Sequence, residues 1–227
     1  MPRKGSRALG SLVVLVLAAA SATAQSPISP YHAGQPDGRN PYARSRDGRS
    51  VEEYAKLLES PDPKLRLNAV EDLGQSEDSR AVNYLLKAIN DPDLRVQARA
   101  IDYLGARRAA DATPLLAQKL FLAGAPRALR QRVLTALGKI GDPSASRPIL
   151  DFIAQEPNPD VRGTGIYTLG EIGDVTIRDE LRKLGESETD PRLKRLVDEA
   201  LVKIATLTRP ATQDFVPPSQ GVVPTLK

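Results

Sequence analysis

Apolar residues return at helical spacing within a motif that recurs about every 32 residues along this chain. The motif reads P-x-x-x-φ-R-x-x-A-φ-x-x-L-G, where φ is an apolar residue, and its first copy covers residues 61–74. A period of this length is typical of a solenoid, in which each repeat is a pair of helices and stacking completes the core. The leucine near the end of each copy gives the register: Leu73, Leu104, Leu137, Leu169 and Leu201.

The motif predicts the second helix of each repeat. In the first copy, Leu65, Ala69, Val70 and Leu73 lie on one helical face, which we expect to point into the core. The position three residues beyond the leucine continues this face and is apolar in the later copies. It reads Ser76, Arg107, Ile140, Ile172 and Ile204.

Residues at both ends of the motif resemble helix caps. An Asp or Asn suits the N-cap because its side chain accepts a free backbone N–H, and a proline after it needs no donor. The third copy begins irregularly, at Ala125-Pro126. The predicted N-caps are Asp62, Asp93, Asn158 and Asp190. Because glycine tolerates positive φ, we expect four second helices to end at Gly74, Gly105, Gly138 and Gly170.

A shorter apolar pattern precedes each copy and predicts the first helix of each pair. Ser50-Val-Glu-Glu53 has the form of a capping box, in which the serine and glutamate side chains each accept a backbone N–H. The predicted core residues of these helices are Val51, Tyr54, Leu57 and Leu58; Val82, Leu85, Leu86 and Ile89; Leu115, Leu116 and Leu120; Ile149, Leu150 and Ile153; and Ile177, Leu181 and Leu184.

The phrases Ile140-Gly-Asp142 and Ile172-Gly-Asp174, together with Val161-Arg162, resemble the HEAT-like repeats of the phycobilisome-lyase type. The resemblance covers residues 50–207. It implies an all-α fold, a right-handed α-solenoid of about five HEAT-like helical hairpins that works as a scaffold or binding platform. Some relatives attach or detach bilin chromophores, or support such reactions as subunits. An accessory subunit of a bilin lyase or of another enzyme complex is therefore the alternative function.

The two ends of the chain differ from the repeats. Residues 1–24 combine a basic start, an apolar run and the small residues Ala22 and Ala24, a pattern that predicts a secretory signal peptide cleaved before Gln25. An uncleaved membrane anchor is the competing interpretation. Residues 25–49 and the proline-rich tail, residues 208–227, have the composition of disordered linkers. We therefore expect a periplasmic or secreted protein whose solenoid covers residues 50–207.

The basic isoelectric point of the chain, about 9.4, arises mainly at its N-terminal end. Residues 1–49 contain seven Lys and Arg against two Asp and Glu, whereas residues 50–208 contain 23 against 25. Because the repeat body has no basic excess, we expect no nucleic-acid partner.

The residue types required by the common kinds of catalysis and metal binding are scarce. The chain has no cysteine, and its single histidine, His32, falls in the predicted linker. The usual zinc, haem and iron–sulfur sites therefore lack their ligands, and Ser/His or Cys/His nucleophiles lack a partner. We predict a protein that is not an enzyme, with no catalytic, metal or cofactor site.

A basic residue follows the first core position of the motif in most copies. It lies within the core-facing arc, where an unpaired charge would be unfavourable. We expect it to reach between repeats and to pair with a cap carboxylate or a loop carbonyl rather than with a ligand. The residues at this position are Arg66, Gln97, Arg130, Arg162 and Lys194.

The opposite face of the second helices varies between copies and mixes both signs of charge. Solenoids of this kind bind partners on the concave surface that such helices line. We therefore predict a monomeric, non-catalytic scaffold or adaptor of the bacterial cell envelope that binds a protein or peptide there. A merely solvated face is the alternative. The predicted partner-binding residues are Arg99, Asp102, Arg132, Thr135 and Tyr167.

Overall fold

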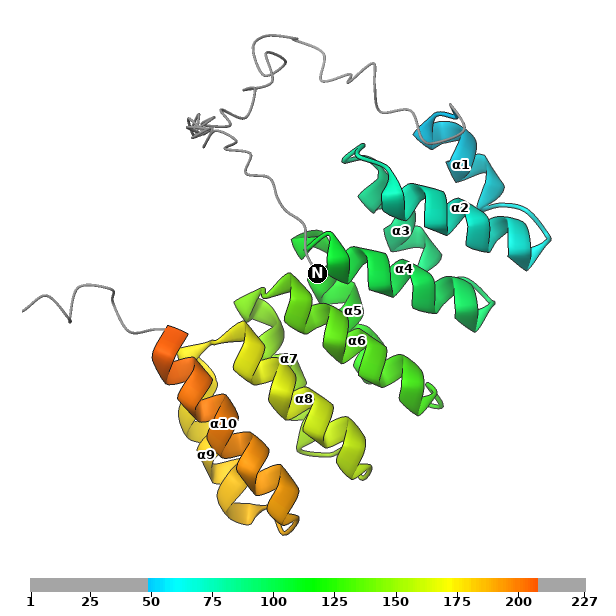
Figure 1. Ribbon diagram of the computed structural model, residues 1–227. Coiled ribbons are helices and arrows are strands. Elements are labelled where there is room, and N and C mark those ends of the chain that lie inside the picture. The colour runs from blue at the N-terminus through cyan, green and yellow to red at the C-terminus, as the bar shows by residue number, and fades with distance from the viewer. Residues whose placement is uncertain (1–48, 208–227) are drawn as a thin grey trace, which may run out of the picture. The chain divides into compact units, whose positions relative to one another are not determined.

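The computed structural model describes residues 49–207, which form five helical hairpins without any strand (Figure 1). The predicted all-α solenoid is therefore confirmed. The predicted signal peptide, nearly all of the linker and the proline-rich tail lie outside the described residues. The hairpins are α1 (Val51–Leu57) with α2 (Pro63–Gln75), α3 (Ala81–Ala88) with α4 (Leu94–Ala106), α5 (Thr113–Leu120) with α6 (Arg127–Ile140), α7 (Ser146–Ile153) with α8 (Pro159–Ile172), and α9 (Arg178–Ser187) with α10 (Pro191–Leu207).

The second helices of the hairpins form a continuous row, because α2, α4, α6, α8 and α10 each pack against the next (Figure 1). Each first helix packs behind its own second helix. Every helix between residues 49 and 207 is too short or too polar to cross a membrane.

The predicted caps are present. Ser50 and Glu53 form the reciprocal capping box of α1, and Asp62 accepts a hydrogen bond from the backbone N–H of Lys64 at 2.8 Å. Asp93, Asn158 and Asp190 act in the same way at the starts of α4, α8 and α10. By contrast, α6 starts after Pro126 with no side-chain cap, as the irregular third copy predicts.

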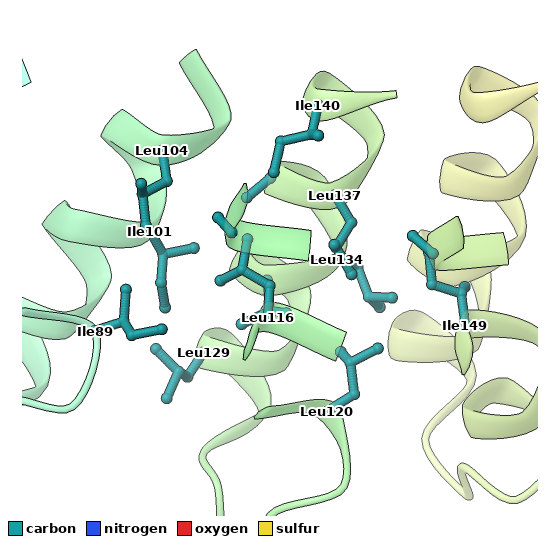
Figure 2. Packing of buried hydrophobic residues seen from close by; sticks show 14 of the residues in the cluster. Ile89, Ile101, Leu104, Leu116, Leu120, Leu129, Leu134, Leu137, Ile140 and Ile149 are labelled. Atoms are coloured by element: carbon teal, nitrogen blue, oxygen red, sulfur yellow. The ribbon is translucent and has the colours of Figure 1, made fainter. Parts of the chain in front are cut away.

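The core runs along the stack between the two layers of helices (Figure 2). The leucines of the first four motifs are fully buried. Two predictions for the core are wrong: Leu65 is 44% exposed and Leu115 is 38% exposed. Leu65 belongs to the first repeat, and no described repeat precedes it. The equivalent residues of later repeats are buried, namely Val96, Leu129, Val161 and Leu193.

The motif glycines do not end the second helices, contrary to the sequence prediction. They lie inside these helices and face the following second helix. A Cβ atom on Gly105 would lie 2.9 Å from the Cα of Ala136, and one on Gly170 would lie 3.0 Å from the Cα of Ala200. Only glycine allows the two backbones to approach so closely. The other two motif glycines, Gly74 and Gly138, face side chains of the next second helix, those of Tyr103 and Thr168.

The glycine three residues further along ends the helix in two repeats. Gly141 and Gly173 are left-handed C-caps of α6 and α8, each with a φ of 73°. Arg108 occupies the equivalent position after α4 and adopts a φ of 51°. A side chain disfavours this conformation, so the turn between the second and third repeats is strained.

The last repeat presents charged residues where the earlier repeats are apolar. Asp198 of α10 is exposed, whereas Leu134 and Ile166 at the equivalent position of earlier repeats are buried. Arg195 is exposed on the same helix. A polar outer face of this kind is the feature that terminates a solenoid.

Candidate functional site

The basic residue of the motif links neighbouring repeats, as its position predicts. Arg66 of α2 donates to both carboxylate oxygens of Asp91 in the second repeat, at 2.7 and 2.8 Å. Its remaining N–H groups reach the carbonyl oxygens of Ser60 and Pro61. The two charged side chains are only 10% and 7% exposed. We call this contact an arginine–carboxylate bridge.

Two further bridges follow along the stack. Arg130 of α6 pairs with Glu156 of the fourth repeat at 3.2 Å, and Arg162 of α8 pairs with Glu188 of the fifth repeat at 3.1 Å. Each carboxylate also accepts a backbone N–H of its own loop, from Asn158 in the first case. The bridges thus join the start of one second helix to the loop of the next repeat.

The environment of Glu188 favours its ionised form. Burial of the carboxyl by itself would raise its pKa. The backbone N–H groups of Asp190 and Thr189, together with Arg162, outweigh burial and hold the pKa of Glu188 below its usual range. The fifth-repeat bridge is therefore charged at neutral pH.

The junction between the second and third repeats has no such bridge. Gln97 replaces the arginine and donates to the backbone carbonyl of Asp91 at 2.6 Å. Gly124 occupies the place of the carboxylate. Lys194, the last member of the column, is exposed on α10. The three arginines of this column are thus engaged in structural contacts between repeats.

The predicted partner-binding residues lie on the row of second helices, and all except Thr135 contact a side chain of a neighbouring second helix. Arg99 of α4 pairs with Glu71 of α2 at 2.7 Å, and Arg132 of α6 forms an ion pair with Asp102 of α4. These side chains are between about one third and one half exposed. Exposed pairs of this type contribute about 0–1 kcal/mol, so a partner can displace them at little cost.

The middle of the contact between α6 and α8 is uncharged, with the Arg127–Asp160 ion pair at its N-terminal end. Gln131 donates to the hydroxyl of Thr164 at 3.4 Å, and the Thr135 hydroxyl donates to the Gln131 carbonyl at 2.9 Å. Tyr167 of α8 is 53% exposed, with the Lys203 ammonium 4.6 Å from its ring centroid. The structure therefore places Thr135 and Tyr167 in a neutral, partly aromatic window that is flanked by ion pairs.

Lys203 also pairs with Glu171 on the C-terminal side of this window. The hydrogen bond from Lys203 lowers the pKa of Glu171. Among residues 49–207, no cluster of three carboxylate or imidazole side chains is arranged to hold a metal ion. The chemistry that this surface offers is hydrogen bonding, ion pairing and aromatic contact.

Two features at the end of α5 were not predicted from the sequence. Phe121 and Leu122, just after α5, are 52% and 50% exposed. Lys119 is only 7% exposed, forms no hydrogen bond or ion pair with residues 49–207, and has a pKa lowered by burial. The sequence does contain an indication of these features, because Lys119 and Phe121 belong to the third repeat, whose loop is longer than those of the other repeats.

Comparison with known proteins places this chain among repeat proteins. A family model described as HEAT repeats matches residues 51–123 and 118–202. The epoxyqueuosine reductase of Bacillus subtilis (strain 168) is 29% identical over 83 residues, which are 36% of this chain and 22% of that enzyme. The chain thus spans less than a quarter of that relative. An engineered protein of known structure is 20% identical in sequence to this chain. The match covers 70% of this chain and 81% of the engineered protein, with a TM-score of 0.49.

Proposed function

Because the chain belongs to the HEAT-repeat family, we propose that it is a non-catalytic scaffold of the bacterial cell envelope that binds a protein or peptide along its row of second helices. The observation that carries the proposal is the neutral window at Thr135 and Tyr167, with exposed ion pairs on both sides. A repeat protein can vary such surface positions without disturbing its core.

The energetics of the row favour a partner that covers the window. The half-exposed ring of Tyr167 supplies a large amphipathic surface, which is the kind of side chain that carries binding energy near the middle of an interface. Arg99 and Arg132 are ion-paired but solvent-accessible, so each can re-pair with a carboxylate of the partner. Central placement between repeats two and four shields these contacts from water.

A triple substitution tests the proposal. Arg99→Ala, Arg132→Ala and Tyr167→Ala together should leave the helical circular dichroism and the melting temperature nearly unchanged. Affinity for a partner recovered from envelope extract should fall at least tenfold, which corresponds to about 1.4 kcal/mol. The matched control changes Tyr84, Arg147 and Arg182 on the first helices to alanine. The row is ruled out as the docking surface if the first variant binds the partner unchanged, or if the control loses as much affinity as the first variant.

Location in the envelope rests on residues 1–24, whose pattern is that of a signal peptide. Mass spectrometry of the protein from an exporting cell should show a mature chain that begins at Gln25. An intact N-terminus in the membrane fraction would instead favour the anchor.

The alternative function, an accessory part of an enzyme complex, gains support from one finding. The matched segment of the epoxyqueuosine reductase is a small part of a longer enzyme. Copurification of the chain with an enzyme whose turnover rate depends on it would favour this alternative. For the bilin-lyase version, a visible absorbance band after incubation with a bilin would be the positive result.

A further inference from the structure

Grooves between successive first helices run along the face opposite the row of second helices, and they differ in charge. The groove between α1 and α3 is lined by Glu52, Lys56, Glu59 and Lys87, among others. The groove between α7 and α9 is lined by Arg147, Asp151, Glu180 and Lys183, among others. The groove between α5 and α7, of about 390 Å³, has no charged residue in its lining. Its walls include Pro114, Ala117, Gln118, Phe121 and Pro148.

A second hollow of about 190 Å³ shares Phe121 with this uncharged groove and is lined on its far side by the Arg130–Glu156 bridge. The rings of Phe121 and Phe152 meet edge to face there, with centroids 5.8 Å apart. Arg130 also lines the hollow, and its buried Nε has no acceptor among residues 49–207. A proline-lined and aromatic-lined groove of this kind suits an extended proline-rich segment.

The chain itself contains such a segment, which begins eight residues after Leu207. Residues 215–226, within the proline-rich tail, carry no charged side chain and include Phe215, Pro217, Pro218 and Pro224. The uncharged character of this segment matches the lining of the α5/α7 groove, whereas the α1/α3 and α7/α9 grooves have charged linings.

The tail also starts at the correct edge of the stack. Leu207, the last residue of α10, lies against the α8–α9 turn, since a Cβ on Gly173 would be 2.6 Å from its Cδ1. The α5/α7 groove opens at the equivalent edge, beside Thr113 and Ser144. Neighbouring helices lie about 8–10 Å apart, so the opening is about 20 Å away. Phe121 lies about 12 Å beyond this opening along α5. The eleven residues after Leu207, up to Pro218, can extend over about 36 Å, which is enough to reach it.

We propose that the proline-rich tail of this protein binds in the groove between α5 and α7 of its own chain, with Phe215 to Pro218 against Phe121. The tail covers the exposed apolar surface of the third repeat and leaves the row of second helices open. This inference does not depend on the proposed function.

Disulfide trapping tests the inference, because the full chain has no native cysteine. One variant carries Gln118→Cys in the groove and Val216→Cys in the tail. The matched control carries Lys183→Cys with Val216→Cys, since Lys183 occupies on α9 the position of Gln118 on α5 and belongs to the repeat from which the tail departs. In a glutathione redox buffer, we expect the first pair to form its intramolecular disulfide at least tenfold faster, by mass spectrometry of the monomer.

Two further variants give the groove a specific signature. Phe121→Ala, or Phe215→Ser in the tail, should reduce trapping at position 118 to the rate of the control. The second change leaves every residue of the described solenoid, 49–207, as it is. Equal or faster trapping at position 183 would overturn the inference and leave the groove to an external partner. Disulfides found only between two chains would assign the groove to the tail of a second copy, and would also overturn it.

Discussion

The junctions between repeats 1 and 2, 3 and 4, and 4 and 5 each contain an arginine–carboxylate bridge, whereas the junction between repeats 2 and 3 contains none. At that junction both residues of the bridge are replaced, the arginine by Gln97 and the carboxylate residue by Gly124. Loss of one member alone would leave a poorly solvated charge without a partner, which is strongly destabilising. The comparison shows that the bridge is an optional addition to a junction between repeats whose main contact is apolar.

The same region differs in its turn. Arg108 adopts the left-handed conformation that Gly141 and Gly173 adopt at later turns. Because the stability of a solenoid is approximately a sum of repeat and interface contributions, we expect the stack to open first between repeats 2 and 3. Native-state hydrogen exchange should detect this opening as lower protection at the end of α4.

The apolar contact common to all junctions should give the largest effect. Leu137→Ala removes a fully buried side chain from α6 and should lower the free energy of unfolding by roughly 2–5 kcal/mol. Arg132→Ala on the same helix removes only an exposed ion pair and should cost at most about 1 kcal/mol. Urea denaturation measures both, and equal midpoints would contradict the register of α6.

Removal of a bridge should cost more than the same change at the junction without one. Arg66→Met leaves Asp91 without its cation and should destabilise by roughly 3 kcal/mol. Gln97→Met removes one neutral hydrogen bond and should cost about 1 kcal/mol. If the two variants unfold at the same urea concentration, the bridge contributes nothing beyond an ordinary hydrogen bond.

Close approach of two backbones should make glycine more necessary at Gly105 than at Gly138. Gly105→Ala forces its new methyl group against the backbone of Ala136 and should cost about 1–3 kcal/mol. Gly138→Ala meets only the Thr168 side chain, at 3.3 Å, and should cost less than about 1 kcal/mol, because a side chain can shift. The thermal midpoints of the two variants give the comparison, and the reverse order would refute it.

The strained turn predicts a stabilising change. Arg108→Gly should raise the free energy of unfolding by about 0.5–1 kcal/mol, because glycine adopts positive φ without a steric cost. The converse variant, Gly141→Ala, should lower the free energy of unfolding by a similar amount, because it places a side chain at a turn that also has positive φ. A destabilised Arg108→Gly would show that the arginine side chain makes a contact worth more than the strain.

Acid should weaken the bridged fifth repeat. The folded-state pKa of Glu188 lies below its unfolded value, so its contribution to stability is present above the unfolded pKa of about 4.5 and is lost as pH falls through the folded pKa. Glu188→Gln should therefore lose stability at pH 7 and show a shallower fall in stability as the pH drops below this unfolded pKa. Parallel pH profiles for the two proteins would show that Glu188 is not linked to folding.

The sequence by itself determined the period, the helix pairs and most of the core. These features depend on local spacing, since a helix of 3.6 residues per turn brings residues such as Ala100, Ile101 and Leu104 to one face. The N-caps at Asp62 and Asn158 were predictable for the same reason. The column of basic residues was also correctly interpreted as structural, because a charge within the core-facing arc requires a partner.

The tertiary structure decided what depends on distances between helices. Gly105 resembles a helix terminator in the sequence, yet the approach of α6 is what requires it. Leu65 has the spacing of a core residue but no described repeat to cover it. The pairing of Arg132 with Asp102, the neutral window at Tyr167 and the uncharged groove beside Phe121 all arise between repeats about 32 residues apart. Periodicity within one helix contains no information on such contacts, because they depend on how the repeats pack.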